Sequence, residues 1–164
     1  IAVGSQTGWL LYVLTRLLRP RTVVETGVAN GHGSFVLLAA LEANGHGTLH
    51  SFDIEPRSGG LVEDDHRDRW HLTIANRANP QPDFKRALAQ IGNVDLFFHD
   101  ADHRYLNQLF EYRTAWPTMS NGGVFLSDDI DNSRAFLHFS ESIGQVPKLL
   151  FDEKKLIGAH RVGS

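Results

Sequence analysis

Acidic side chains follow several short apolar runs of this 164-residue chain, and these acids are the residues best placed to do chemistry. Asp100 follows the run Val94–His99, and Asp128 and Asp129 follow Val124–Ser127. If these runs are neighbouring strands ~5 Å apart, the three carboxylates can meet at one site. Three unpaired acids in one cleft repel one another, and a bound cation is the simplest remedy. The pattern therefore predicts a cation site.

The chemistry of such a site is that of a hard divalent ion. A carboxylate site favours Mg²⁺, Mn²⁺ or Ca²⁺ over zinc, and a bound ion would lower the pKa of a hydroxyl and orient it. His103, three residues after Asp100, could then accept the hydroxyl proton. Two simpler interpretations stay open: His103 is an exposed loop residue, or Asp128 and Asp129 only form a turn before a helix capped by Asp131 or Asn132.

A glycine-rich loop, Glu25 to Ser34, provides a second candidate site. Glycines let the backbone turn tightly and let a ligand approach closely. The spacing of Gly27, Gly31 and Gly33 matches both the loop of short-chain dehydrogenases and the first motif of class I methyltransferases. A purely structural turn is the remaining alternative.

Charge separates the two cofactors that could use this loop. A dinucleotide contains a pyrophosphate, which the carboxylate of Glu25 at the strand end would repel. S-adenosylmethionine instead carries a cationic ammonium and a cationic sulfonium, which the same carboxylate would attract. The dehydrogenase interpretation also needs a Tyr-xxx-Lys pair, and none of the three tyrosines has a lysine four residues later. Asp53, twenty residues past Gly33, is placed to hold ribose hydroxyls, with Glu55 as the competing candidate.

These residues need a framework, and the chain supplies alternating strand and helix patterns. The predicted strands are 22–25, 48–53, 71–75, 94–99 and 124–127, with a terminal hairpin of 148–151 and 155–159. The predicted helices are 10–18, 34–43, 83–91 (opened by an Asp83 cap), 105–116 and 133–141. The alternation predicts an α/β fold with a largely parallel sheet covered on both faces. Ligands of such sheets bind beyond the carboxyl ends of the strands.

Composition narrows the class of protein further. The length fits a single domain over residues 1–164, and the first residue is Ile1, so we expect an N-terminal extension to be missing. A formal charge of −3 argues against a nucleic-acid partner, and the absence of cysteine excludes disulfides and thiolate sites. No signal peptide or membrane-spanning segment is visible, which predicts a cytoplasmic protein with no membrane partner.

Four blocks in order carry a family resemblance: residues 23–31, 51–56, 95–103 and 122–129. Together they resemble the class I S-adenosylmethionine-dependent methyltransferases. Within these they are most similar to the metal-dependent O-methyltransferases of the catechol, caffeoyl-ester and macrolide-sugar types. The likeness extends from about Val3 to about His160. It implies a Rossmann-like, seven-stranded, mostly parallel sheet with helices on both faces and an antiparallel last strand.

The resemblance also implies roles for individual residues. Asp100, Asp128 and Asp129 match the metal ligands, and His103 matches the catalytic base of the macrolide-sugar type. The catechol and caffeoyl types have Asp-Asn where this chain has Asp128-Asp129. The cofactor-binding set that we expect is Val3, Glu25, Gly27, Gly31, Ser34, Asp53, Asn76 and Asp100.

The predicted function is metal-assisted O-methylation of a small hydroxylated acceptor, with S-adenosylmethionine and a divalent ion, most simply Mg²⁺, as cofactors. Two alternatives stay open: a metal-independent N-methyltransferase, and a domain that binds the cofactor without catalysing transfer. Aromatic residues such as Trp9 and Phe136 are expected to pack the core or a partner subunit, so a homo-oligomer is compatible with the sequence.

Overall fold

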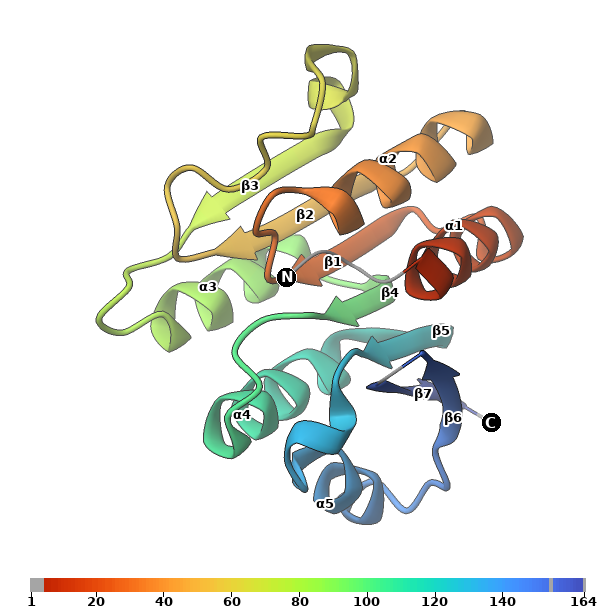
Figure 1. The fold of residues 1–164 in the computed structure, drawn as a ribbon, viewed down its shortest axis with the longest axis vertical. Helices are drawn as coiled ribbons and strands as arrows, with labels where there is room; N and C mark the ends of the chain where they lie inside the picture. The colour runs from red at the N-terminus through yellow and green to blue at the C-terminus, as the bar shows by residue number, and fades with distance from the viewer. Residues whose placement is uncertain (1–4, 154, 164) are drawn as a thin grey trace.

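The computed structural model describes residues 5–153 and 155–163 (Figure 1), so the predicted cofactor contact of Val3 lies outside the described residues. The strands are β1 (Thr22–Thr26), β2 (Thr48–Asp53), β3 (Trp70–Ile74), β4 (Val94–His99), β5 (Met119–Ser127), β6 (Lys148–Asp152) and β7 (Lys155–Arg161). The α-helices are α1 (Ser5–Leu18), α2 (His32–Asn44), α3 (Gln81–Ile91), α4 (Tyr105–Ala115) and α5 (Ala135–Ser142). Three short 3₁₀ helices are η1 (Asp64–Arg69), η2 (Trp116–Thr118) and η3 (Ile130–Asn132).

The seven strands form one sheet in the order β3-β2-β1-β4-β5-β7-β6. Strands β1 to β5 pair in parallel, whereas β7 is antiparallel to β5 and to β6. The arrowheads of β1 to β5 therefore lie at one edge of the sheet (Figure 1). This confirms the predicted Rossmann-like sheet with a reversed last strand. The chain leaves β1 toward β2 on one side and reaches β4 on the other, so the switch point lies between β1 and β4.

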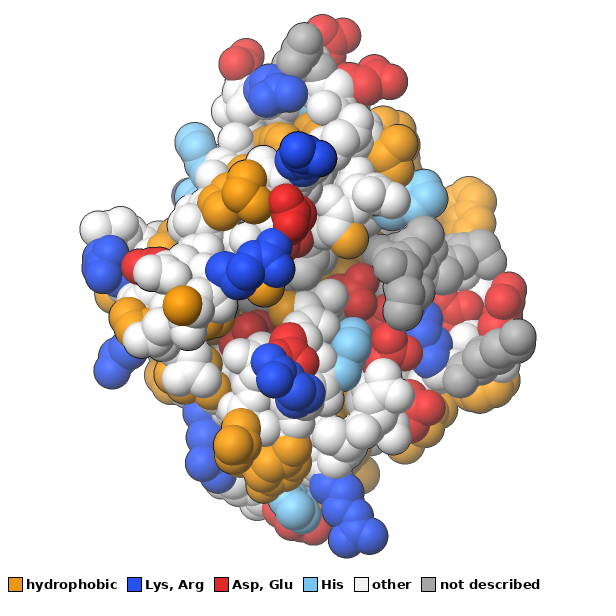
Figure 2. Space-filling view, turned by 60° about the vertical axis from the view of Figure 1, so that its left-hand side comes forward, with side chains coloured by type: hydrophobic (Ala, Val, Ile, Leu, Met, Phe, Trp, Pro, Cys, Tyr) orange, Lys and Arg blue, Asp and Glu red, His pale blue; other side chains and the backbone are white. Residues whose placement is uncertain are grey.

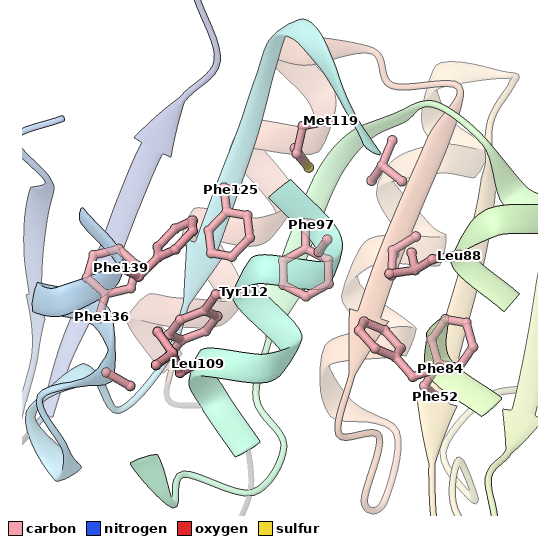
Figure 3. Packing of buried hydrophobic residues seen from close by; sticks show 14 residues of the cluster. Phe52, Phe84, Leu88, Phe97, Leu109, Tyr112, Met119, Phe125, Phe136 and Phe139 are labelled. Carbon is pink, nitrogen blue, oxygen red and sulfur yellow. The ribbon is translucent and has the colours of Figure 1, made fainter. Parts of the chain in front are cut away.

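Two helical layers cover the two faces of the sheet, because successive strand residues point to opposite sides. Val23 packs with α1 and α2, whereas its neighbour Val24 packs with α3, α4 and α5. The second face is rich in aromatic rings (Figure 3), where the Phe97 and Phe125 rings stack at 4.8 Å and Tyr112 is fully buried. These two cores fix the strand register and hence the positions of the strand ends.

Several predicted helix boundaries were wrong in detail. Helix α3 begins at Gln81 after Pro80, and Asp83 instead accepts the N–H of Asn76 at 2.9 Å. Helix α5 begins at Ala135 without a side-chain bond from its N-cap residue, and the Ala135 N–H donates to the Ser133 hydroxyl instead. Helix α3 therefore starts after a proline and not at an Asp83 cap, and the first N–H of α5 is bound by Ser133 and not by Asp131 or Asn132.

Among the described residues, no helix has both the length and the apolar character needed to cross a membrane. Aromatic residues were expected to pack the core or a partner subunit, and Trp116 packs against the aromatic core. Trp9 on α1 is instead 70 % exposed.

Candidate functional site

The loop between β1 and α2 requires its glycines for two measurable reasons. Gly27 has φ +83°, and a Cβ there would lie 2.1 Å from the Asp100 carbonyl oxygen. Gly31 has φ +94°, and a Cβ there would lie 2.9 Å from the Gly59 Cα. Both dihedrals fall in the left-handed region that favours glycine. The loop therefore passes directly against the end of β4, which joins the cofactor-type motif to the acidic cluster.

Asp53 at the end of β2 holds this loop in place. Its Oδ2 accepts the N–H groups of Val28 and Ala29 at 2.8 and 2.9 Å, and its Oδ1 accepts those of Ile54 and Glu55 at 2.7 and 2.9 Å. Burial raises the pKa of Asp53, but these backbone donors lower it more, so it lies below the ordinary value. A carboxylate has about four acceptor positions, and here the backbone uses them all. Asp53 thus holds the loop to the end of β2 through backbone hydrogen bonds.

Glu55, the competing ribose candidate, is engaged as well. Its Oε2 accepts a hydrogen bond from Arg77 Nη2 at 2.6 Å, and both side chains are largely exposed. Asn76 precedes Arg77 in the loop after β3, and its side-chain oxygen accepts the Ala78 N–H at 2.9 Å. Asn76 therefore organises its own loop, and Asp53, Glu55 and Arg77 line a cavity.

Glu25 is buried behind the loop instead of facing open space. Its Oε2 accepts hydrogen bonds from the Ser34 and Ser51 hydroxyls at 2.5 and 2.8 Å. Burial raises the pKa of Glu25 to about 7, although the two serine bonds oppose the shift. Two predicted cofactor residues, Glu25 and Ser34, thus bind each other, and Ser51 on β2 joins them without any signal in the sequence motif.

A cavity of about 900 Å³ opens at the carboxyl ends of the parallel strands. That size falls in the usual range for small-molecule sites. Of the predicted cofactor residues, Gly27, Asp53 and Asp100 line it, together with Ala101 and Glu111. Glu25, Gly31, Ser34 and Asn76 are not among its lining residues. The cavity occupies the switch-point position that the α/β sequence pattern predicts for a ligand.

A compact group of possible cation ligands adjoins the cavity. One donor atom each from Asp100, His103 and Asp129 lies within 4.8 Å of the others. His103 Nε2 is 3.5 Å from Asp129 Oδ2 and 3.8 Å from Asp100 Oδ1. Figure 2 shows acidic and histidine side chains gathered in a hollow of this face. Asp129 adopts φ +50°, an uncommon conformation for a residue with a side chain, and such backbone strain often concentrates at functional sites.

Asp128 adjoins this group and forms an acidic cluster with Asp100 and Asp129, but it is not one of the three residues whose donor atoms lie within 4.8 Å of one another. It is fully buried, and its Oδ1 accepts the N–H of Asp129 at 3.0 Å. Its Oδ2 accepts a short hydrogen bond from the ammonium group of Lys155, the first residue of β7. The structure therefore brings two of the three predicted metal ligands, Asp100 and Asp129, within 4.8 Å of each other, and it pairs the third, Asp128, with a lysine that the sequence motifs did not single out.

Electrostatics in this cluster oppose ionisation. Burial raises the pKa of Asp100 to about 8, and the neighbouring Asp128 adds to that rise while Lys155 opposes it. Burial likewise raises the pKa of Asp128, with Lys155 opposing the shift. A cation added between these carboxylates would favour their charged forms. The cluster therefore has the electrostatics of a site that benefits from additional positive charge.

A second pair, the fully buried His99 and the mostly buried Glu111, lies at the wall of the cavity. His99 is fully buried at the end of β4, and its Nε2 is 3.4 Å from Glu111 Oε2. Asn107 donates to the other Glu111 oxygen at 2.9 Å. The Tyr112 hydroxyl lies 2.6 Å from the Ser127 hydroxyl, which in turn is 3.5 Å from His99 Nδ1. Glu111 is a cavity-lining acid that the sequence interpretation missed.

The buried carboxyl of Glu111 gives a test of these electrostatics. Burial raises its pKa to about 7. Because the folded pKa exceeds the ordinary 4.5, the stabilising contribution of the protonated form is complete below pH 4.5 and is lost as the pH rises through 7. Glu111→Gln should therefore be more stable than the wild type at pH 8, by up to about 3 kcal/mol, and about equal to it at pH 4.

Urea unfolding at both pH values measures this difference. Glu141→Gln, which changes an exposed acid on α5, serves as the control and should leave the pH dependence unaltered. A Glu111→Gln variant that loses stability equally at both pH values would show that ionisation of Glu111 carries no pH-dependent penalty, which contradicts the prediction.

The comparisons with known proteins agree with this architecture. A family model described as a methyltransferase domain matches residues 24–130. The O-methyltransferase TomG from Streptomyces achromogenes, solved with S-adenosylmethionine, superposes with a TM-score of 0.77 at 21% identity, covering 99% of this chain and 82% of that one. An O-methyltransferase from Bacillus cereus, solved with S-adenosylhomocysteine, gives 0.75 at 18% identity, covering 98% and 82%.

A third similar structure is the MycE methyltransferase of the mycinamycin pathway, solved with Mg, S-adenosylhomocysteine and mycinamycin VI. It superposes with a TM-score of 0.67 at 15% identity, over 90% of this chain and 47% of that one. At these identities the structural likeness establishes the fold. No curated protein matches the sequence significantly.

Proposed function

Since this chain belongs to the methyltransferase domain family, we propose that it transfers the methyl group of S-adenosylmethionine to a hydroxyl oxygen of a small acceptor, with help from a divalent cation. One observation carries this proposal: Asp100 both lines the cavity at the strand ends and belongs to the cation-ligand cluster. A donor in the cavity and an ion in the cluster would therefore be immediate neighbours.

The residues present fit both cofactors. Carboxylate oxygens suit a hard ion such as Mg²⁺, and two acids with an adjacent histidine lie within coordination reach of one point. The cavity borders Gly27, whose lack of a side chain lets the loop pack directly against the Asp100 backbone. When bound, the cation would lower the pKa of the acceptor hydroxyl, and the sulfonium of the donor would supply an activated methyl group.

The protein's own residues would do the rest by positioning and proton transfer. Methyl transfer needs the oxygen and the methyl carbon held in line, which is an orientation effect. Asp100 and Asp129 would orient the acceptor through the cation, and His103 Nε2, which faces both carboxylates, would take the hydroxyl proton. Glu25 and Asp53 would contribute by holding the donor loop in its observed shape.

Chelation tests the cation requirement. We expect titration calorimetry to detect S-adenosylmethionine binding with or without EDTA, because Asp100 is the one lining residue of the cavity that also belongs to the group of possible cation ligands among the described residues. Transfer to a library of small hydroxylated acceptors, followed with radiolabelled donor, should fall by about 100-fold or more in EDTA and return with Mg²⁺ or Mn²⁺. Absence of donor binding would overturn the transferase proposal. Binding without any turnover would favour the catalytically idle domain instead.

One observation supports a second candidate, a metal-independent transferase. The ammonium group of Lys155 already forms an ion pair with Asp128, so a side chain of the protein neutralises part of the negative charge of the acidic cluster. The same chelation experiment decides between the two, because full turnover in EDTA would favour this candidate. Acceptors with amine and hydroxyl nucleophiles, compared side by side, would then identify the atom that receives the methyl group.

A further inference from the structure

Lys155 is a cationic residue beside the acidic cluster that the proposed metal-assisted reaction has not used. It begins β7, directly after the turn of the terminal hairpin, and its side chain is only 17% exposed. Its register is fixed on both sides: the next residue, Leu156, donates its N–H to Asp131 at 3.0 Å, and Gly158 pairs with Ser127 of β5. The hairpin therefore carries this ammonium group into the acidic cluster by backbone pairing.

Within the acidic cluster, the ammonium group of Lys155 is hydrogen-bonded to Asp128. Both oxygens of Asp128 are in use, Oδ1 by the Asp129 N–H and Oδ2 by the Lys155 ammonium. By contrast, Asp100 and Asp129 have donor atoms that face His103 and one another. Of the three carboxylates that the sequence nominates as ligands, two are thus poised to receive an ion and one is held by an internal cation.

We infer that Lys155 competes with the divalent cation for Asp128 and thereby lowers the affinity of the site. This inference rests on the proposed function. A dication entering the cluster meets the ammonium group at close range, and two positive charges separated by a few ångströms in a partly buried site repel strongly. Full coordination by three carboxylates would require Lys155 to leave Asp128, whereas with Lys155 in place the ion is held by Asp100 and Asp129.

Replacing Lys155 by methionine tests this competition without relying on activity. Methionine keeps an unbranched side chain of similar length but removes the charge. We expect Lys155→Met to bind Mn²⁺ at least about tenfold more tightly than the wild type, measured by electron paramagnetic resonance of free Mn²⁺. The thermal midpoint of Lys155→Met should also rise more on Mn²⁺ addition, because the ion restores a partner to the buried Asp128.

Two further variants isolate the cause. Asp128→Asn with Lys155→Met removes both charges of the pair, so its Mn²⁺ affinity should return to about the wild-type value while the buried site stays neutral. This double variant also keeps the test valid if Lys155→Met alone folds poorly, because the unpaired acid has been removed. Lys148→Met, which removes an exposed lysine from the neighbouring strand β6, should leave Mn²⁺ affinity unchanged.

The outcomes separate this inference from the proposed function. Equal Mn²⁺ affinity in the wild type and Lys155→Met would overturn the competition while leaving a cation-assisted transferase intact. Mn²⁺ binding by none of the proteins would overturn both the competition and the cation requirement. In that case, donor binding measured by calorimetry would still decide the transferase assignment. Tighter binding in Lys155→Met that persists in the double variant would also contradict a role through Asp128.

Discussion

His103→Gln should lower kcat for methyl transfer by about 10²- to 10⁴-fold while leaving the affinity for S-adenosylmethionine almost unchanged. Under the proposed function, the imidazole accepts the acceptor's hydroxyl proton, and glutamine keeps similar bulk without a basic nitrogen. His103 is not among the residues that line the donor cavity, so donor binding has no direct reason to change. Single-turnover rates and calorimetry with the donor measure the two quantities separately.

The same variant also tests whether His103 acts as a base or as a metal ligand, because His103 is one of the three possible cation ligands that lie within 4.8 Å of one another. We expect the Mn²⁺ affinity of His103→Gln to stay close to that of the wild type. A parallel loss of Mn²⁺ affinity and turnover would make His103 a ligand. His71→Gln, which changes an exposed histidine on β3, is the matched control and should behave as wild type. Unimpaired turnover in His103→Gln would remove the residue from the reaction.

Gly27→Ala should destabilise the fold by about 3 kcal/mol or more and abolish donor binding in whatever protein remains folded. Two separate effects add at this position. Alanine is strained at φ +83°, and its Cβ would lie 2.1 Å from a backbone oxygen of Asp100, which cannot move aside as a flexible side chain could. Urea unfolding gives the stability, and calorimetry gives the donor affinity.

Gly45→Ala separates the cost of a strained backbone dihedral from the cost of a steric clash of the added Cβ. Gly45 also has a left-handed backbone, with φ +76°, but a Cβ there would meet nothing within 4 Å. Its substitution should therefore show the dihedral cost alone, about 1 kcal/mol. Similar losses for the two variants would mean that β1 and β4 can separate at Asp100 at little cost, and that the loop is less tightly fixed than the geometry indicates.

The positions of the strand ends could be predicted because two local signals coincide there. Apolar runs such as Val94–His99 reveal a buried strand, and the acid that follows each run marks the point where the strand leaves the core. The glycine spacing after β1 likewise reflects a local backbone requirement, which the left-handed conformations of Gly27 and Gly31 confirm. Local rules therefore sufficed for the sheet, the loop and the approximate place of the acidic residues.

The side-chain partners of these residues could not be predicted in the same way. They depend on how strands and helices that are distant in the sequence pair and pack in the folded protein. Lys155 reaches Asp128 only because β7 runs antiparallel to β5 with one particular pairing. Glu111 looked like an ordinary polar position among the apolar residues of α4, and only the packing of that helix against β4 brings it to His99. The saturation of Asp53 by backbone donors is also a property of the folded loop.

The shared position of Asp100 has a thermodynamic consequence. One carboxylate borders both the cavity and the cation cluster, and Gly27 packs against the backbone of the same residue. Any rearrangement of Asp100 on binding one ligand must alter what the other encounters. By linkage, the factor by which the ion changes donor affinity equals the factor by which the donor changes ion affinity. Under the proposed function, the donor and the ion therefore change each other's affinity by the same factor, and the order in which they are added cannot alter the final equilibrium of the ternary complex.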